Sequence, residues 1–481
     1  AVTAVLKWLE DEVAFTRRGA AGVRQVEVTG LIAARFTHRD SRAGDPDLHT
    51  HVAISNKVQA LDDGAWRALD GAVLFQATVA ASERYNTLLE TELEARLGVR
   101  FVEREPSSPG LRAIREIAGV DPALMQRWSS RRREIDVRRA ELAREFLDHH
   151  GRPPTPKEAI ELAQQANLET REAKHEPRSE AEQRGVWRQQ AEELLGGPDA
   201  VAAMLSRSTA HRVESMPVDP QALSLGVLST VVEARARFAD THVMAEALRR
   251  VRGHGLSSAE AEDLAQRVTG LCLADAGTVD LSVDDLITEP VELRRSDGRS
   301  VYERAHSRLY TTLDTLAAEE RIVSAAHRVD GRRITATDVA AAGRSGSVTL
   351  NRGQATMVRE IAVSGARAQL VLAPAGSGKT TAMAVFADAW SASGGTLVGL
   401  APSAVAAGEL GESTGIPSTT IAAFLLRPDA VDADTMILID EAGMASTRDL
   451  DAVVQIALAA GASVRLVGDD QQLASVQAGG V

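Results

Sequence analysis

The chain has 481 residues, of which 44% are hydrophobic, so each of the three or four domains that this length predicts can bury a core. The formal net charge of −13 at pH 7 disfavours a protein that coats nucleic acid nonspecifically, although a local basic groove stays compatible with it. No uninterrupted apolar run reaches the roughly 20 residues that a membrane-spanning helix needs, so membrane insertion is not expected.

One cysteine, Cys272, excludes an internal disulfide and favours a reducing, cytoplasmic environment. Its apolar neighbours indicate a small core residue. No secretory signal opens the chain. Because the sequence begins without methionine and stops at "QAGGV" with no closing element, we expect a piece of a longer protein.

The first hundred residues are predicted to alternate helices and strands. Residues 1–17 have helical periodicity, residues 24–38 indicate a strand pair or one long strand, and residues 49–58 a further strand. Residues 75–98 predict a long amphipathic helix that ends at its final glycine, as helix C-termini prefer.

Three histidines, His38, His49 and His51, are clustered in this first segment. His49 and His51 are two apart on a predicted strand and therefore face the same way, while His38 ends the preceding strand and the linking loop could bring it alongside. Three neutral imidazoles would leave positions open for water or phosphate oxygens, as in a catalytic metal site. Imidazole suits Zn²⁺, Mn²⁺ or Ni²⁺ better than Mg²⁺, but the sequence does not choose between them. The alternative is an incidental His-x-His pair.

Residues 106–200 are predicted to form charge-rich helices separated by the breaker "GRPPTP". Their arginines could contact phosphates, and a solvated helix face with i,i+4 ion pairs is an equally good interpretation. These arginines are at positions 127, 131–133, 138, 139 and 144. Trp66, Trp128 and Trp187 could stack on unpaired bases, but packing is the favoured interpretation.

Residues 201–345 are predicted to be mainly helical, with short strands indicated near 277–282 and 290–304. They carry no chemistry that the sequence can assign. From about residue 346 a strand–loop–helix pattern repeats, which predicts a parallel sheet with helices on its faces.

The stretch "APAGSGKT" at 373–380 fits the phosphate-binding loop, with Ala373 in place of the usual first glycine. It follows a predicted strand and precedes a predicted helix, as this motif requires. The glycines allow backbone N–H groups to surround the phosphates at a helix N-terminus. Lys379 would neutralise the β- and γ-phosphates, and the Thr380 hydroxyl would reach Mg²⁺.

A second signal lies sixty residues further on, where the buried strand "MILID" ends in Asp440 and Glu441. One carboxylate there can hold the Mg²⁺ shell, and its neighbour can activate water for attack on the γ-phosphate. An acidic pair facing solvent is the alternative, which the preceding phosphate loop disfavours.

The C-terminal segment resembles superfamily 1 helicases of the branch typified by the alpha subunit of exonuclease V. "DEAGM" and "LVGDDQQL" look like motifs II and III, and "GLAPSAVAAGEL" looks like motif Ia. The resemblance implies that Gln354 reads adenine, that Gln472 senses the γ-phosphate and that Asp469 supports motif III. It also puts Pro402 and Ser403 near the DNA. Because ATP in this family lies between two motor domains, this chain alone is expected to bind nucleotide poorly and hardly to hydrolyse it.

These motifs define the predicted ATP site. Catalytic roles are assigned to Lys379, Asp440, Glu441 and Gln472. Nucleotide contacts are assigned to Gln354, Ala375, Gly376, Ser377, Gly378, Lys379, Thr380 and Thr381, with Thr380 and Asp440 holding Mg²⁺.

"FTHRDSR" followed by "DPDLHTH" and Asn56 resembles the third motif of TrwC/TraI-type conjugative relaxases, which belong to the HUH endonuclease class. Sequence similarity at residues 66–99 and 166–196 extends the resemblance over about residues 1–200. It implies that the three histidines hold a divalent cation that polarises the scissile phosphate of single-stranded DNA. A tyrosine then attacks and forms a 5′-phosphotyrosyl link. In that family a helicase is fused behind the relaxase.

The predicted fold is therefore multidomain α/β and α. A partial HUH-type antiparallel-sheet relaxase domain at 1–200 is followed by a mainly helical accessory domain at 201–345 and a RecA-like parallel α/β P-loop domain at 346–481. The implied partners are single-stranded DNA of a plasmid origin of transfer, relaxosome proteins and conjugation coupling proteins, in the cytoplasm of a bacterium.

The nucleophile departs from the family pattern, because no tyrosine precedes His38. Tyr85 lies on an amphipathic helix and is predicted to pack, while Tyr302 and Tyr310 have no partner motif. The chain is expected to hold a cation and DNA without nicking. The alternatives are a nucleic-acid-dependent ATPase whose N-terminal histidines are incidental, and a non-catalytic DNA-binding remnant.

Overall fold

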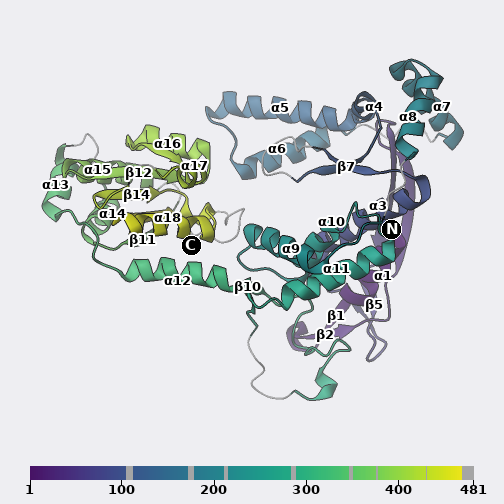
Figure 1. Cartoon of the computed structure of the whole chain (residues 1–481), viewed down its shortest axis with the longest axis horizontal. Coiled ribbons are helices and arrows are strands. Elements are labelled where there is room, and N and C mark those ends of the chain that lie inside the picture. Colours follow the sequence, from purple (N-terminus) through teal and green to yellow (C-terminus); the bar gives the residue numbers. More distant parts are fainter. Residues whose placement is uncertain are drawn as a thin grey trace. The chain divides into compact units, whose positions relative to one another are not determined.

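The computed structural model describes residues 1–104, 112–171, 178–210, 215–282, 289–345, 350–374, 377–428 and 431–468. They pack into two compact units (Figure 1). Unit 1 comprises Ala1–Asp219, Ala247–Gln266 and Ile287–His306, and unit 2 comprises Pro220–Glu246, Arg267–Leu286 and Ser307–Val481. The predicted middle segment, 201–345, is thus shared between the two units. No helix of the described residues is both long and apolar enough to span a membrane.

The strands of unit 1 form antiparallel pairs rather than one continuous sheet among the described residues. The pairs are β1 (Phe15–Arg18) with β2 (Arg24–Glu27), β3 (Ala33–Asp40) with β4 (Pro46–Ile54), β5 (Lys57–Gln59) with β6 (Trp66–Ala68), and β7 (Phe101–Arg104) with β8 (Ile114–Ile117). Residues 24–38 therefore contain two strands and not one long strand. The two strands pair with β1 and β4 and not with each other. Gly30, at φ +150, separates them in a conformation that side chains rarely adopt.

The N-terminal helix is shorter than predicted. Helix α1 (Val2–Trp8) continues as a π-helical turn (Leu9–Val13), after which β1 begins at Phe15. The first two residues of β1, Phe15 and Thr16, are both buried, and this packing overrides the helical periodicity.

Seven further helices precede residue 210 in the described part of unit 1. They are α2 (Gly71–Gln76), α3 (Thr78–Leu97), α4 (Pro122–Arg127), α5 (Ser130–His150), α6 (Pro156–Glu169), α7 (Glu180–Leu195) and α8 (Pro198–Thr209). Gly98 ends α3 in the left-handed conformation, as predicted. The helix predicted around "DPALMQRWSSRRREI" is two helices, because Ser129 donates its hydroxyl to the carbonyl of Met125 and the backbone leaves helical geometry there.

The chain then forms α9 (Pro220–Ala234), α10 (Asp240–Arg250), α11 (Ser258–Leu273), β9 (Thr278–Asp280), β10 (Tyr310–Thr312), α12 (Leu313–His327) and α13 (Ala336–Ser345). The strand predicted near 277–282 is present and pairs with β10. The strand predicted near 290–304 is not; a 3₁₀ turn (Val291–Leu293) and a single bridge between Arg294 and Ser300 replace it.

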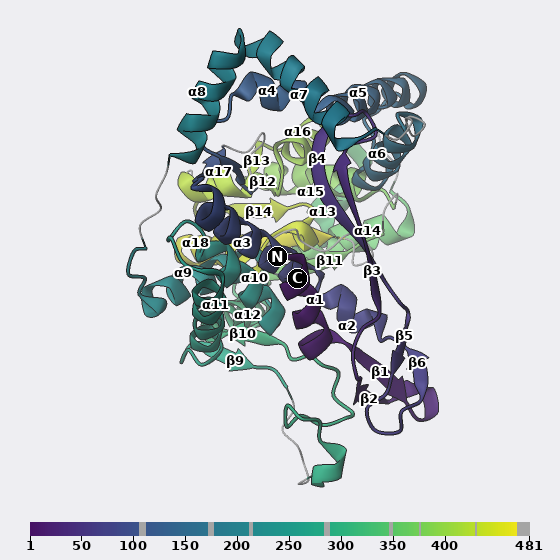
Figure 2. The ribbon, with the colours of Figure 1, turned by 90° about the vertical axis from the view of Figure 1, so that its right-hand side faces the viewer.

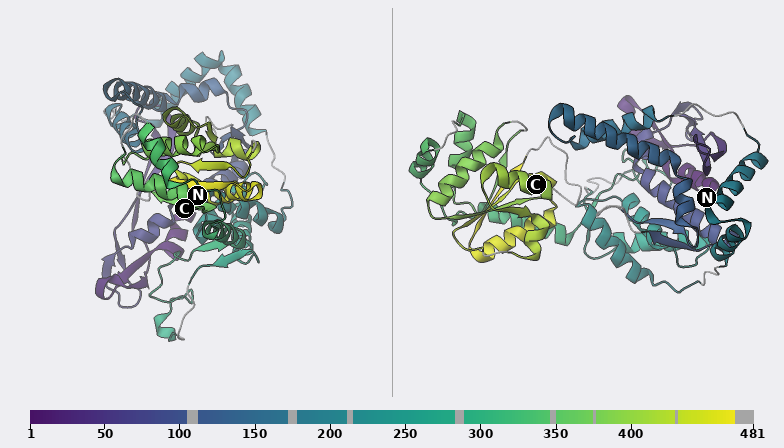
Figure 3. Two further views of the ribbon diagram at one scale, coloured as in Figure 1. Left: turned by 90° about the vertical axis from the view of Figure 1, so that its left-hand side faces the viewer. Right: turned by 90° about the horizontal axis from the view of Figure 1, so that it is seen from above.

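The C-terminal part of unit 2 is a five-stranded parallel sheet in the order β11-β15-β14-β12-β13, which confirms the predicted parallel sheet (Figure 3). Its strands are β11 (Ala368–Leu372), β12 (Thr396–Ala401), β13 (Ser418–Thr420), β14 (Thr435–Ile439) and β15 (Ser463–Gly468). Its helices are α14 (Arg352–Val363), α15 (Lys379–Ala392), α16 (Ala404–Thr414), α17 (Ile421–Leu426) and α18 (Thr447–Ala460).

Alternation along each strand builds two cores, one on each face of this sheet. Met436 and Leu438 of β14 pack with α14, α15 and α16, whereas Ile437 and Ile439 pack with α12, α17 and α18. All five residues of β14 are buried. The sheet is therefore rigid at the edge where the phosphate loop and the acidic pair begin.

Candidate metal centre and nucleotide site

Strands β3 and β4 form a long two-stranded ribbon (Figure 2). Their register puts the three histidines on one face of it. His38 is directly opposite His49, and His51 is opposite Phe36, two positions along, so all three rings point the same way. Thr37 and Thr50 face the other side, with their hydroxyls 3.1 Å apart. The alignment inferred from sequence, with His38 brought alongside the other two, is present in the structure.

The spacing of the rings suits one shared cation. Their centroids are 5.4 Å apart for His38 and His49, 5.3 Å for His38 and His51, and 5.0 Å for His49 and His51. A Zn–N bond of about 2.1 Å puts a ring centroid about 3.2 Å from the metal, so tetrahedral ligands have centroids about 5 Å apart. No group of three or more His, Cys, Asp or Glu side chains in the described ranges has its ligand atoms already converged for an ion. Binding therefore requires the rings to turn in place.

His49 already has the outer partner that metal-binding histidines have in proteins. Its Nδ1 lies 2.8 Å from the backbone oxygen of Asp47 and 3.4 Å from the carboxylate of the same residue. A proton on Nδ1 satisfies both oxygens and leaves Nε2 with the lone pair that a cation needs.

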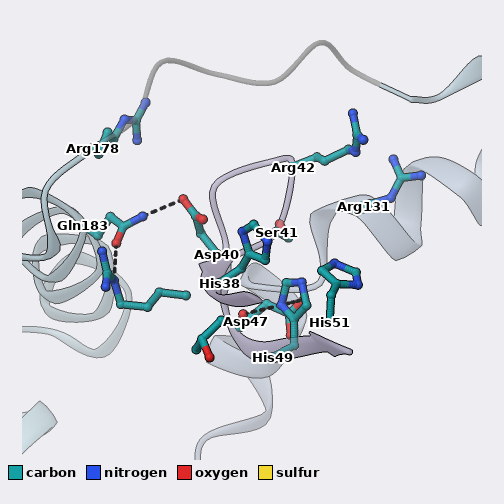
Figure 4. A pocket seen from close by; sticks show the side chains of 12 residues that line it. His38, Asp40, Ser41, Arg42, Asp47, His49, His51, Arg131, Arg178 and Gln183 are labelled. Atoms are coloured by element: carbon teal, nitrogen blue, oxygen red, sulfur yellow. Dashed lines mark hydrogen bonds and ion pairs between the residues drawn. The ribbon is translucent and has the colours of Figure 1, made fainter. Parts of the chain in front are cut away.

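The histidines open onto a pocket of about 590 Å³ whose lining also includes four arginines and two acidic residues (Figure 4). The arginines are Arg39, Arg42, Arg131 and Arg178, and the acidic residues are Asp40 and Asp47. Arg131 also donates to Asn167 Oδ1 (2.7 Å) and to the carbonyl of Thr170 (3.2 Å), which fix its position at the pocket wall. The pocket therefore combines imidazoles with guanidinium groups, a set suited to a cation and a phosphodiester together.

Sequence reasoning found the histidines but missed most of this lining. Arg42 and Asp47 lie in the loop that was expected only to link the strands. Arg178 and Gln183 are more than 120 residues further along, and no local signal joins them to the ribbon.

The arginines of α5 had two interpretations, contact with phosphates and ion pairing along the helix. Arg132 pairs with Asp136 (2.9 Å), and Arg138 pairs with Glu141 (3.0 Å) and two further glutamates, which favours the ion-pair interpretation of α5. The pKa of Arg138 is raised by these hydrogen bonds.

Two of the three tryptophans considered for base stacking are packed, and one is exposed. Trp128 packs with Leu124 and donates to Gln190 Oε1 (2.9 Å), and Trp187 donates to the carbonyl of Gly44 (2.9 Å), so both are structural anchors. Trp66 is 56% exposed and stays open to stacking. Neither Tyr85 nor Tyr302 lines the pocket, and Tyr310 belongs to unit 2.

In unit 2 the phosphate loop and the acidic pair follow strands that end at the same edge of the sheet. β11 precedes the loop, β14 precedes Asp440, and β15 lies between them, so the two strand ends are about 10 Å apart. Lys379, Thr380 and Thr381 form the first turn of α15. Ala375, Gly376, Asp469 and Gln472 lie outside the described residues.

The acidic pair is partly buried and electrostatically coupled to the lysine. Burial raises the pKa of Asp440, while the hydrogen bond from the Glu441 amide (2.9 Å) and the charge of Lys379 oppose that rise. Burial and Asp440 raise the pKa of Glu441, and Lys379 again opposes. Glu441 has φ 52 and ψ 37, a left-handed conformation that is uncommon for a residue other than glycine. Two desolvated carboxylates next to a lysine favour a bound divalent cation.

Gln354 lies against the phosphate loop. Its Oε1 accepts from the Asn351 amide (2.9 Å) in a capping box at the start of α14, and its Nε2 donates to the carbonyls of Ser377 (3.0 Å) and Gly378 (3.4 Å). The Gln354 side chain therefore lies next to the phosphate loop, and both its amide oxygen and its amide nitrogen are hydrogen-bonded to backbone groups.

Comparisons with known proteins divide the chain in the same way as its motifs. Residues 1–194 match the family model described as TrwC relaxase, and residues 349–481 match the model described as AAA domain. The conjugal transfer protein TraA of Rhizobium radiobacter is 40% identical over 118 residues, covering 24% of this chain and 11% of the relative. The probable conjugal transfer protein TraA of Sinorhizobium fredii is 35% identical over 176 residues, 35% of this chain and 16% of the relative.

The multifunctional conjugation protein TraI of Escherichia coli is 27% identical over 246 residues, which are 45% of this chain and 13% of TraI. A solved structure of TrwC complexed with a 27-mer DNA comprising the recognition hairpin and the cleavage site is 28% identical, covers 40% of this chain and 62% of that one, and has a TM-score of 0.32. The chain spans less than a fifth of the length of these curated relatives. It carries a TrwC relaxase domain followed by an AAA domain, and its relatives are conjugal transfer proteins.

Proposed function

We propose that this chain processes DNA in conjugative transfer as part of a relaxase–helicase, in which unit 1 binds a divalent cation and single-stranded DNA and unit 2 binds ATP with Mg²⁺. The observation that carries the proposal is the cluster of His38, His49 and His51 on one strand face, with centroids 5.0–5.4 Å apart, in a pocket lined by arginines.

In unit 1 the three imidazoles would hold the cation through the nitrogens that they can turn toward one another. When bound, the cation supplies charge that polarises a phosphodiester. Arg42, Arg131 and Arg178 would hold the DNA backbone, because guanidinium groups match phosphate oxygens in geometry and charge. The described residues that line this pocket include no tyrosine, so a nucleophilic tyrosine would have to come from elsewhere.

In unit 2 Lys379 would neutralise the β- and γ-phosphates, and Thr380 with Asp440 would hold Mg²⁺. Glu441 would orient and activate the attacking water. Gln354 would read adenine after releasing the loop carbonyls, and Gln472 would sense the γ-phosphate. The implied DNA is that of a plasmid origin of transfer, with relaxosome and coupling proteins as partners in a bacterial cytoplasm.

The decisive experiment is a calorimetric titration of the full chain with Mn²⁺, Zn²⁺, Ni²⁺ and Mg²⁺ in turn. His49→Ala should weaken binding of the preferred ion by at least the about 10- to 100-fold that loss of an outer partner costs. His149→Ala is the matched control, because His149 is exposed at the end of α5 and does not line the pocket.

The same proteins should be titrated with a fluorescein-labelled single-stranded oligonucleotide. The affinity of the unaltered chain should rise when the cation is added, and that of the His49→Ala variant should not. Equal cation affinity in the unaltered chain and His49→Ala would reject the metal site.

A further inference from the structure

The turn between β3 and β4, which brings His38 opposite His49, is fixed by contacts with residues outside these two strands. In the described residues β3 and β4 pair only with each other, and almost all of β3 is exposed. A two-stranded ribbon has little stability by itself in water. The positions of the three rings therefore depend on whatever fixes the end of this ribbon.

Helix α7 provides the first of these contacts through Gln183, which is 6% exposed. Its Oε1 accepts from Arg39 Nε (3.0 Å), and its Nε2 donates to Asp40 Oδ2 (2.7 Å) (Figure 4). Arg39 and Asp40 immediately follow His38 on β3. One buried amide thus links both residues next to a histidine to a helix more than 140 positions away.

Two further contacts hold the turn itself. One helical turn beyond Gln183, Trp187 donates its indole N–H to the carbonyl of Gly44 (2.9 Å). Asp45, which is 7% exposed, accepts from the backbone amide of Ser130 (3.0 Å) and from its hydroxyl, at the start of α5. A carboxylate at a helix N-terminus is favoured by the helix dipole.

We infer that α7 is the positioning element of the histidine cluster, with Gln183 as its positioning residue, so that cation binding and the docking of α7 on the ribbon stabilise each other. The inference rests on the cation site of the proposed function. The coupling must be reciprocal: a helix that fixes the rings raises cation affinity, and a bound cation that fixes the rings holds the helix more firmly.

The test compares Gln183→Leu with Gln189→Leu in the full chain. Both glutamines lie on α7, but Gln189 is exposed and bonds only with Glu193 (2.8 Å), so the second variant controls for the substitution itself. Gln183→Leu should weaken Mn²⁺ binding about 10-fold, the lower end of the loss expected for an outer partner, and Gln189→Leu should leave it unchanged.

Amide hydrogen exchange distinguishes the positioning role from a merely structural one, because only the positioning role makes exchange in α7 depend on the cation. Saturating Mn²⁺ should slow amide exchange across residues 180–195 of the unaltered chain about 10-fold and leave it unchanged in His51→Ala. Without cation, exchange across residues 37–51 should be faster in Gln183→Leu than in Gln189→Leu.

The outcomes separate the two claims. If the unaltered chain binds no divalent cation, the proposed function fails, while faster ribbon exchange in Gln183→Leu still upholds the positioning role. If Gln183→Leu and Gln189→Leu bind Mn²⁺ equally, the inference is overturned. Should Gln183→Leu not fold, Trp187→Phe decides, because it removes the bond to Gly44 and keeps an aromatic ring and Gln183 in place; unchanged Mn²⁺ affinity there overturns the inference as well.

Discussion

Arg465 on β15 is a buried cation that has no carboxylate partner among the described residues, and its replacement by methionine should loosen α14. The side chain is 0% exposed. Its guanidinium donates to the carbonyls of Ile361 (3.0 Å from both Nε and Nη2) and Ala366 (2.8 Å), at the C-terminal end of α14. It therefore supplies further donors, and positive charge to a helix end whose last turn has no basic residue of its own.

The free-energy change expected for Arg465→Met follows from two opposing contributions, the cost of burying the charge and the gain from its hydrogen bonds. Burial lowers the pKa of Arg465 from its ordinary value to about 10, a cost of about 3 kcal/mol. Besides the three hydrogen bonds to Ile361 and Ala366, Arg465 Nη1 donates to the carbonyl of Val464 (3.0 Å). Four hydrogen bonds from a charged donor to carbonyl oxygens contribute about 1.5 kcal/mol each, about 6 kcal/mol together. The difference, about 3 kcal/mol in favour of the arginine, agrees with the about 1–3 kcal/mol expected for each carbonyl that loses its donor in Arg465→Met.

Amide exchange of α14 is the assay, because a chain of two units does not unfold in one step. A loss of about 3 kcal/mol should speed exchange over residues 355–366 about 100-fold in Arg465→Met. Arg448→Met, on the exposed side of α18, is the control and should leave this exchange unchanged. Protection of α14 within threefold of the unaltered chain would refute the assignment of a helix-end role to this arginine.

Two further predictions concern the nucleotide loop and the thiol. Lys379→Ala should weaken binding of a fluorescent ATP analogue with Mg²⁺ by about 10- to 100-fold, since a charged hydrogen bond is worth about 1.5–3 kcal/mol, and Lys57→Ala should not; equal losses would mean that the loop does not hold the phosphates. Cys272 is 1% exposed and burial raises its pKa to about 11, so a thiol reagent at pH 8 should modify it only after denaturation. Because the pKa of this thiol is raised on folding, its contribution to stability should be complete below pH 9 and should disappear as the pH rises toward 11; prompt reaction of the native chain at pH 8 would contradict its burial.

The sequence predicted those parts of both sites that depend on local periodicity. His49 and His51 share a face because strand side chains alternate, and His38 joins them because a short loop makes neighbouring strands antiparallel. Asp440 and Lys379 meet one edge of the sheet because parallel strands end together.

The failures came where tertiary packing overrides local pattern. Residues 14–18 continue a helical periodicity in sequence, but Phe15 and Thr16 are buried against β2 and β6, so the strand is preferred. The break at Ser129 depends on one side-chain hydrogen bond to Met125, which composition does not reveal.

The same distinction explains why the histidine motif is not sufficient for its site. A motif of fourteen residues can put three imidazoles on one face, but it cannot fix the end of an exposed ribbon. That task falls to Asp45 with Ser130, and to Gly44 with Trp187, contacts that join positions 85 and 143 residues apart. Such contacts form only after α5 and α7 have packed, because loop closure over that distance costs entropy that the ribbon cannot repay alone. If the histidines hold a cation as proposed, the helices that follow the motif are as necessary to that site as the histidines. Substitutions at Gln183 or Asp45 should then weaken cation binding without altering any of the three histidines.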